Sequence, residues 1–394
     1  MRSKSLMRCL GGTLGTFLMS SALAAPAAEI RLGLVNTLTT SAAAPGEAGK
    51  EGVELALEQL GSKMGGIPVK LFIEDDGVNP ALGKQKTEKL ILQDRVNFIV
   101  GYNYSNVLMG AYKAASDNQT FLLSTNAGPA PLAGKQCSPW FFALRDESEQ
   151  APRALGEELN RKGVKRLYAM APNYVAGKEM VGGILSAYKG EVVGQDYTKW
   201  PDQLDFSSEI AKLKAANPDA VYIFYPPAHA LQFVSQYQQA GLKDKIPLYS
   251  NYTFDGITIP QLGKLAEGAL MTMFWSVDSN NETNRRFVDS FKKKYGREPS
   301  NFAASAYDTV MLIDSAVRAV KGEMGDKAKL QAALEAADFQ SVRGKIRFGK
   351  NHFPIQDFYL LQVVQAEDGT FTTKTLSKVA TDDVDSYAQD CKMK

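Results

Sequence analysis

Short apolar segments alternate with amphipathic helical segments along almost the whole chain from residue 29 onward. Residues 29–35 form the first expected strand, and residues 46–60 form a helix whose apolar positions recur at the 3.6-residue period. Further strands are expected at residues 69–74, 96–100, 120–123, 140–142, 164–169, 220–225, 247–249, 269–275 and 345–348. Apolar strands that are each followed by a crossover helix predict an α/β fold whose parallel sheets are covered on both sides.

The chain is too long for one such sheet. Its 394 residues exceed the ~250–300 at which a single core stops growing, so two doubly wound lobes are expected. The polar stretch at residues 144–150 is the natural break between them. Because strands at 269–275 and 345–348 come much later, the chain is expected to cross between the lobes more than once.

Residues 1–28 have the features of a secretory signal peptide. Arg2, Lys4 and Arg8 precede an apolar stretch over residues 10–23, and small residues follow. The alternative is a membrane anchor, but ~14 apolar residues fall short of the ~20 that a spanning helix needs. Cleavage is therefore expected before Glu29, giving an exported and soluble mature chain.

The number of cysteines in the mature chain agrees with export. Cys9 leaves with the signal peptide, so Cys137 and Cys391 remain as an even pair in an oxidising compartment, and a disulfide between them is predicted. Two unpaired thiols are the alternative.

The formal net charge is +2, and the densest basic cluster is residues 292–294 on an amphipathic helix. A nucleic-acid partner is therefore not expected.

The sequence lacks the patterns of common catalytic sites. The chain has two histidines, His229 and His352, and neither lies in a motif, so both are interpreted as structural or solvated. There is no G-x-S-x-G, H-E-x-x-H, C-x-x-C or P-loop pattern, and no G-x-G-x-x-G follows a strand. We therefore predict a protein without catalysis, with no cofactor and no metal.

Polar and aromatic residues gather where the expected strands end. In open α/β sheets, ligands bind in the crevice at the carboxyl ends of the strands. The segments that would line it are residues 36–46, 101–105, 124–128, 172–177, 225–229 and 250–255. Their hydroxyls, amides and helix N-termini suit a small anion such as a carboxylate, and their tyrosines can enclose an apolar or aromatic body.

The order of several short motifs resembles a known family. They are Gly52-Val53-Glu54-Leu55-Ala56, Gly101…Ser105, Ser124-Thr125-Asn126-Ala127-Gly128, and Ala171-Pro172-Asn173-Tyr174 followed by Gly177-Lys178. In this order they are similar to the periplasmic solute-binding proteins of ABC importers, in the leucine/isoleucine/valine-binding branch with the type I fold. The resemblance covers about residues 30–371.

The resemblance implies two parallel-sheet lobes joined by a multi-stranded hinge. The expected lobe 1 contains residues 29–145 and 276–349, and lobe 2 contains residues 146–275 and 350–375. A C-terminal tail, residues 376–394, is expected to return to lobe 1. The family further implies a periplasmic, monomeric protein whose lobes close over the ligand.

The resemblance also implies a set of ligand-binding residues. The ligand's carboxylate is expected near Ser105 and the loop from Asn126 to Gly128, with Tyr174 closing over the ligand and Tyr225 and Tyr252 at its other end. Arg145 is expected either to bind the acid in a bidentate manner or to be a surface residue that connects the lobes. The full set of candidate ligand-binding residues is Thr40, Tyr104, Ser105, Asn126, Gly128, Arg145, Tyr174, Tyr225 and Tyr252.

One departure from the family bears on the ligand. Asn126 and Gly128 replace the small residue and the threonine that are typical of leucine binders, and Asp255 is only a loose match for the acid that grips an ammonium group. Because an unpaired buried ammonium group is costly, this argues against an α-amino acid. The tyrosines and the Ala171-Pro172-Asn173-Tyr174 segment favour the subgroup that binds aromatic carboxylates, with a branched-chain amino acid as the next choice.

The predicted function is capture of a small organic acid by hinge closure and its delivery to an ABC permease. Two alternatives remain open. One is an exported sensor that presents the same ligands to a receptor, and the other is a secreted α/β hydrolase, which the scarcity of histidine disfavours.

Overall fold

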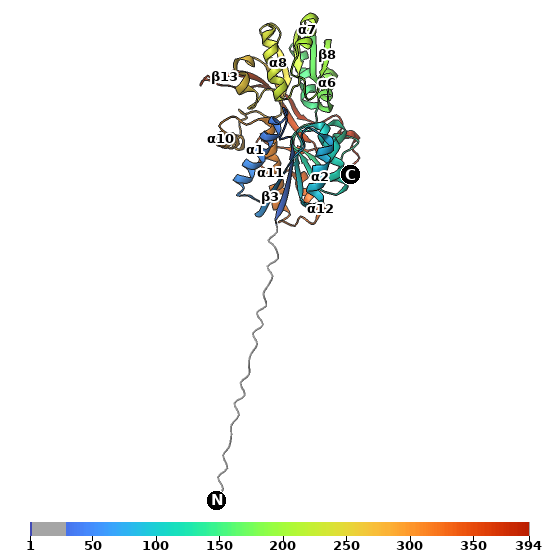
Figure 1. The fold of residues 1–394 in the computed structure, drawn as a ribbon, viewed down its shortest axis with the longest axis vertical. Helices are drawn as coiled ribbons and strands as arrows, with labels where there is room; N and C mark the ends of the chain where they lie inside the picture. Colours follow the sequence, from blue (N-terminus) through green and yellow to red (C-terminus); the bar gives the residue numbers. More distant parts are fainter. Residues whose placement is uncertain (2–28, 394) are drawn as a thin grey trace.

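A computed structural model describes residue 1 and residues 29–393. It has two α/β lobes, each built around its own sheet, stacked along the long axis of the molecule (Figure 1). Apart from residue 1, the predicted signal peptide lies outside the described residues. None of the helices among the described residues is long and apolar enough to cross a membrane.

The sheet of lobe 1 has six strands in the order β2-β3-β1-β4-β5-β6. The strands are β1 (Ile30–Asn36), β2 (Lys63–Met64), β3 (Ile67–Asp75), β4 (Phe98–Gly101), β5 (Phe121–Ser124) and β6 (Phe141–Ala143). All neighbours are parallel except the β2–β3 pair. Every residue of β4 and β5 is buried, as expected of strands covered on both faces.

Helices cover both faces of this sheet. They are α1 (Ala44–Gln59), α2 (Pro80–Leu92), α3 (Ser105–Asp117), α4 (Ala130–Ala133), α10 (Glu282–Tyr295), α11 (Asn301–Ala319) and α12 (Lys327–Ala336). Asn79 caps α2 as its sequence predicts, with Oδ1 accepting from the Ala81 and Leu82 amides at 2.9 and 3.1 Å. Helix α1 packs closely on α11, since a Cβ on Gly52 would lie 2.3 Å from the Ala303 carbonyl oxygen.

The sheet of lobe 2 has eight strands, with β12-β13-β11-β10-β9-β7-β8 in order and β14 paired with β13. The strands are β7 (Arg166–Pro172), β8 (Glu191–Thr198), β9 (Ala220–Ile223), β10 (Leu248–Asn251), β11 (Leu270–Met273), β12 (Arg347–Phe348), β13 (Pro354–Gln365) and β14 (Phe371–Asp383). The helices are α5 (Gln150–Arg161), α6 (Val175–Ala187), α7 (Ser207–Ala216), α8 (Pro227–Gln239) and α9 (Ile259–Leu262), with short 3₁₀ turns η1 (Gly263–Leu265) and η2 (Ala388–Asp390). Strands β7 to β11 run parallel, and β13 and β14 run antiparallel.

Three segments connect the lobes. They join β6 to α5, β11 to α10, and α12 to the paired strands β12 and β13. Strand β14 continues to Asp383, beyond residue 375, where the sequence predicted the second lobe to end. The reason is that β14 is an edge strand whose residues are largely polar and exposed or half-buried, so it carries no continuous apolar run.

The C-terminal tail is fixed to lobe 1 by a disulfide. Cys137 and Cys391 are bonded, with their Cα atoms 5.7 Å apart, which confirms the predicted pairing. The C-terminus accordingly lies beside lobe 1 in Figure 1. The residues that precede Cys391 add polar contacts, since the Asp385 carboxylate accepts from Asn351 at 2.9 Å and the Tyr387 hydroxyl donates to Glu149 at 2.9 Å.

Candidate functional site

The carboxyl ends of the parallel strands in the two lobes face each other. Strands β4, β5 and β6 of lobe 1 lead into residues 101–105, 124–128 and 144–149, while β7, β9 and β10 of lobe 2 lead into residues 172–177, 224–229 and 251–255. Side chains from these segments touch across the boundary in two groups, one charged and one aromatic. This is the crevice at which ligands bind in folds of this class.

The charged group is centred on Arg145, which is buried and connects the lobes. Its Nη1 donates to Asn126 Oδ1 at 2.5 Å and its Nε donates to Asp146 Oδ1 at 3.1 Å. The guanidinium carbon lies 3.6 Å from the centre of the Tyr252 ring, and the Tyr252 hydroxyl donates to Asp146 Oδ2 at 2.6 Å. Because Asn126 follows β5 and Tyr252 follows β10, the Arg145 network spans both lobes.

Arg145 is held as a cation in this network. Burial lowers the pKa of Arg145, but the charge of Asp146, the nearby Tyr252 and the hydrogen bonds to both together outweigh burial and raise that pKa above its ordinary value. Burial also raises the pKa of Tyr252 well above the usual range, so its hydroxyl stays a donor. A guanidinium has five N–H donors, so the bonds to Asn126 and Asp146 leave donors for a further acceptor. Such a site can bind a carboxylate.

The aromatic group consists of Tyr104, Tyr174 and Trp200. The Tyr174 and Trp200 rings stack at 4.9 Å with an interplanar angle of 19°. The Tyr104 ring lies 5.1 Å from Trp200 and 6.2 Å from Tyr174. Tyr104 belongs to lobe 1, whereas Tyr174 and Trp200 belong to lobe 2, so these rings also meet across the boundary.

Backbone strain is found at matching places in the two lobes. Tyr102 directly follows β4 with φ +60°, and Tyr252 directly follows β10 with φ +59°. A left-handed backbone is uncommon for residues other than glycine and is costly, and such residues cluster at ligand sites. Strain at both strand ends therefore adds to the case for a site here.

The remaining predicted residues differ in their surroundings. Ser105 is buried at the first position of α3. Gly128 allows the connecting segment to approach, because a Cβ there would lie 2.1 Å from the Asp146 carbonyl oxygen. Tyr225 is buried next to His229. Thr40 lies in an exposed turn, where its hydroxyl oxygen accepts from the Ala42 amide at 3.2 Å, and its described hydrogen bonds reach neither the Arg145 network nor the aromatic group.

Sequence reasoning missed three residues in or beside the site. Asp146 and Trp200 are described above. Arg343 donates to Asp308 Oδ2 at 3.2 Å and to Gln356 Oε1 at 3.0 Å, and it lies close enough to the Arg145 network for the charge of Asp146 to act on it. Trp200 carried the strongest signal, because it lies two residues after the end of β8 and directly before a proline. Strand β8 was not predicted, however, since its polar and half-exposed residues show no apolar run.

Asp255 is placed inside the protein. Its Oδ2 accepts from Asn301 Nδ2 at 2.9 Å and its Oδ1 accepts from the Ile257 amide at 2.9 Å. Burial raises the pKa of this carboxyl to about 6. Asp255 thus stabilises the contact between its own loop and α11, and no hydrogen bond ties it to the Arg145 network.

The two histidines have different environments. His352 is a structural residue, as predicted: Nδ1 and the Phe141 carbonyl are 2.9 Å apart, as are Nε2 and Glu335, and the ring stacks on Phe142 at 3.9 Å. His229 is buried in the first turn of α8, where its ring lies 5.0 Å from Trp200. Among the described residues, no group of three or more His, Cys, Asp or Glu side chains could hold a metal ion.

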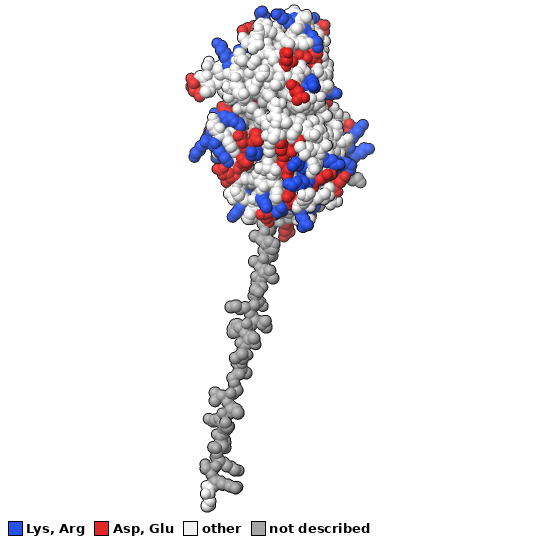
Figure 2. Space-filling model, in the orientation of Figure 1, with Lys and Arg blue, Asp and Glu red and all other residues white. Residues whose placement is uncertain are grey.

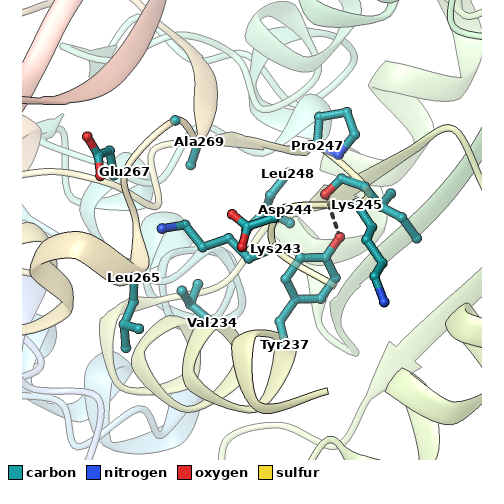
Figure 3. A pocket seen from close by; sticks show the side chains of 12 residues that line it. Val234, Tyr237, Lys243, Asp244, Lys245, Pro247, Leu248, Leu265, Glu267 and Ala269 are labelled. Atoms are coloured by element: carbon teal, nitrogen blue, oxygen red, sulfur yellow. Dashed lines mark hydrogen bonds between the residues drawn. The ribbon is translucent and has the colours of Figure 1, made fainter. Parts of the chain in front are cut away.

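A surface hollow of about 310 Å³ lies elsewhere on lobe 2 (Figure 3). Its lining includes Val234 and Tyr237 of α8 and residues 243–248. Leu248 and Ala269 place it at the amino ends of β10 and β11, at the opposite edge of the sheet from the crevice. The hollow is therefore separate from the candidate site.

The comparisons with known proteins agree with this geometry. The Leu/Ile/Val-binding protein homolog 6 of Brucella melitensis biotype 1 is 26% identical, over 90% of this chain and 93% of the relative. A solute-binding protein of an R. palustris ABC transporter, solved in complex with benzoate, is 30% identical, with a TM-score of 0.87 over 93% of this chain and 100% of that chain.

A more distant solved structure shares the fold. It is the substrate-binding protein of a branched-chain amino acid transporter from Streptococcus pneumoniae, in complex with isoleucine, and it is 22% identical with a TM-score of 0.79 over 89% of this chain and 100% of that chain. Residues 29–370 match the family described as periplasmic binding protein. The two lobes, the facing strand ends and this match lead to one conclusion: the chain belongs to the periplasmic binding protein family.

Proposed function

We propose that this protein is the periplasmic solute-binding component of an ABC transporter and that it captures a small aromatic carboxylate. The observation that carries the proposal is the pairing of a buried cation, Arg145, with a bridging group of aromatic rings at the lobe boundary. If the ring of the ligand packs against Tyr104, Tyr174 and Trp200, the carboxylate of the ligand would point toward lobe 1.

The carboxylate would lie near the N-terminus of α3 and the loop from Asn126 to Gly128. Helix N-termini offer unpaired N–H groups and a positive dipole end to an anion. Ser105 would add a hydroxyl, and Arg145 would add charge. Burial of one aromatic ring together with pairing of one carboxylate can supply the ~8 kcal/mol that a Kd of 1 μM requires.

The 30%-identical neighbour with benzoate supports an aromatic acid. Asp255 is engaged by Asn301, which weakens the case for recognition of an ammonium group. A branched-chain amino acid is the second candidate, supported by the names of the curated relatives.

The protein would act as a monomer, without catalysis, and deliver its ligand to permease subunits. A sensor that presents the ligand to a receptor would use the same cleft.

Titration calorimetry of the mature protein with benzoate, L-leucine and L-isoleucine tests this proposal. We expect benzoate to bind with a Kd in the micromolar range or below, and at least tenfold tighter than either amino acid. Tighter binding of L-leucine or L-isoleucine than of benzoate would contradict an aromatic carboxylate and make a branched-chain amino acid the ligand. Turnover of an ester or amide substrate would contradict the absence of catalysis.

A further inference from the structure

Three neighbouring side chains of lobe 2 have buried polar atoms without a hydrogen-bond partner. They are Trp200 at Nε1, Tyr225 at its hydroxyl, and His229 at both ring nitrogens. The His229 ring lies 5.0 Å from Trp200 and 6.5 Å from Tyr225. Tyr225 and His229 are each only 1% exposed. We call these three residues the lobe 2 polar group.

Other buried polar atoms among the described residues also have no partner, but these four are gathered on three neighbouring side chains. The large majority of buried side-chain polar atoms in proteins form a hydrogen bond, because a buried polar atom without a partner lowers stability. Thr198 lies near Tyr225, and the backbone of Pro201 lies near His229, but neither completes a hydrogen bond to them within the described residues. By contrast, the buried His352 has partners on both ring nitrogens. The lobe 2 polar group therefore calls for a partner from outside the chain.

The lobe 2 polar group adjoins the proposed ligand site. Trp200 is a member of the lobe 2 polar group, and its ring also stacks on Tyr174 and contacts Tyr104 in the aromatic group. The three residues come from the loop after β8, the segment after β9 and the first turn of α8. They lie on the lobe 2 side of the aromatic group, while the carboxylate is proposed to lie on the lobe 1 side. A bound aromatic acid whose carboxylate points toward lobe 1 would direct the opposite edge of its ring toward the lobe 2 polar group.

The donors and acceptors of the lobe 2 polar group fit a hydroxyl. Burial lowers the pKa of His229, so its ring is neutral near pH 7, with one nitrogen donating and the other accepting. The Trp200 N–H donates, and the Tyr225 hydroxyl can do either. A second carboxylate fits poorly, since the charge that acts on His229 is that of the Asp202 carboxylate.

We infer that Trp200, Tyr225 and His229 bind a hydroxyl group on the ring of an aromatic carboxylate, so that the protein prefers hydroxylated aromatic acids over unsubstituted ones. This inference rests on the proposed function. A site built to hydrogen-bond a substrate hydroxyl discriminates strongly against the analogue that lacks it, because the polar groups of the site are then left unpaired.

The test is calorimetric titration of the mature protein with benzoate, 4-methylbenzoate, 3-hydroxybenzoate, 4-hydroxybenzoate and terephthalate. At least one hydroxybenzoate should bind fivefold or more tighter than both benzoate and 4-methylbenzoate. In Tyr225→Phe or His229→Phe, that ratio should fall at least threefold. Tyr237→Phe is the matched control: it removes a buried hydroxyl of α8 that donates to the Ile246 carbonyl at 2.8 Å beside the separate surface hollow (Figure 3), and the ratio should persist.

Three results would overturn the inference. They are a preference below fivefold for both hydroxybenzoates, a preference that survives in both variants, or tighter binding of terephthalate than of either hydroxybenzoate. Binding of benzoate with no hydroxyl preference would leave the proposed function intact. Absence of binding by every aromatic acid would instead remove the proposed function and this inference with it.

Discussion

At the scale of single residues, the site depends on side chains whose charge and shape are fixed by their neighbours. Arg145 is buried, yet it keeps its charge because Asp146 and the Tyr252 ring compensate it. The sequence could identify Asn126 and Tyr252 as candidates through the family resemblance, and Arg145 as a possible bidentate partner of an acid. It could not show that they form one network, because that network depends on how two lobes meet.

Tyr174 provides the residue-scale prediction. Its ring is 9% exposed and stacks on Trp200, so removal of the ring should take away a wall of the ligand site. Tyr174→Ala should weaken binding of the preferred ligand at least tenfold in titration calorimetry, a loss of ~1.4 kcal/mol or more. Tyr197→Ala, which removes an exposed tyrosine of β8, is the matched control. An unchanged Kd in Tyr174→Ala would exclude Tyr174 from the site.

At the scale of elements, the strands that the sequence predicts are those buried on both faces. Strands β4, β5 and β9 are continuous apolar runs and were found within one or two residues. Strands β8, β13 and β14 were missed, and β8 and β14 lie at sheet edges with many exposed polar residues. Because Trp200 follows β8, missing that strand also meant missing an aromatic residue of the candidate site.

Helix α6 carries a contact between the lobes that depends on pH. Glu179 Oε1 accepts from the Ala130 amide at the start of α4 at 3.0 Å. Burial raises the pKa of Glu179 to about 7 from an ordinary value of 4.5, against the hydrogen bonds from Ser148 and Ala130, which lower it. The nearby charge of Glu149 also raises the pKa. The folded state thus holds this proton more tightly than the unfolded state does.

A raised carboxyl pKa makes the folded state lose stability as pH rises from about 4.5 to about 7. Glu179→Gln removes this titration and keeps the acceptor for Ala130. The variant should be more stable than the unaltered protein at pH 7.5, by up to ~3 kcal/mol, with little difference at pH 4.5. Thermal unfolding across this pH range, with the exposed Glu157→Gln as control, checks this. Parallel pH profiles for Glu179→Gln and the unaltered protein would contradict it.

At the scale of the whole molecule, length and strand–helix alternation were enough to predict two parallel-sheet lobes. The Cys137–Cys391 pairing also followed from the sequence, because export left one even pair of cysteines. The full extent of lobe 2 did not follow, since its last two strands, β13 and β14, were not predicted. Acidic and basic side chains are interspersed over the face shown in Figure 2, which gives no patch of one sign there for a polyanion.

Closure of the lobes is the central claim at this scale. The Arg145 network and the aromatic group hold atoms from both lobes together, so a ligand that adds contacts to both should favour the closed arrangement.

Small-angle X-ray scattering of the mature protein, with and without saturating benzoate or hydroxybenzoate, tests this claim most directly. We predict a smaller radius of gyration in the presence of the ligand, and return to the starting value once the unaltered ligand is dialysed away. Identical profiles at a ligand concentration that calorimetry shows to be saturating would contradict closure of the cleft as the basis of binding.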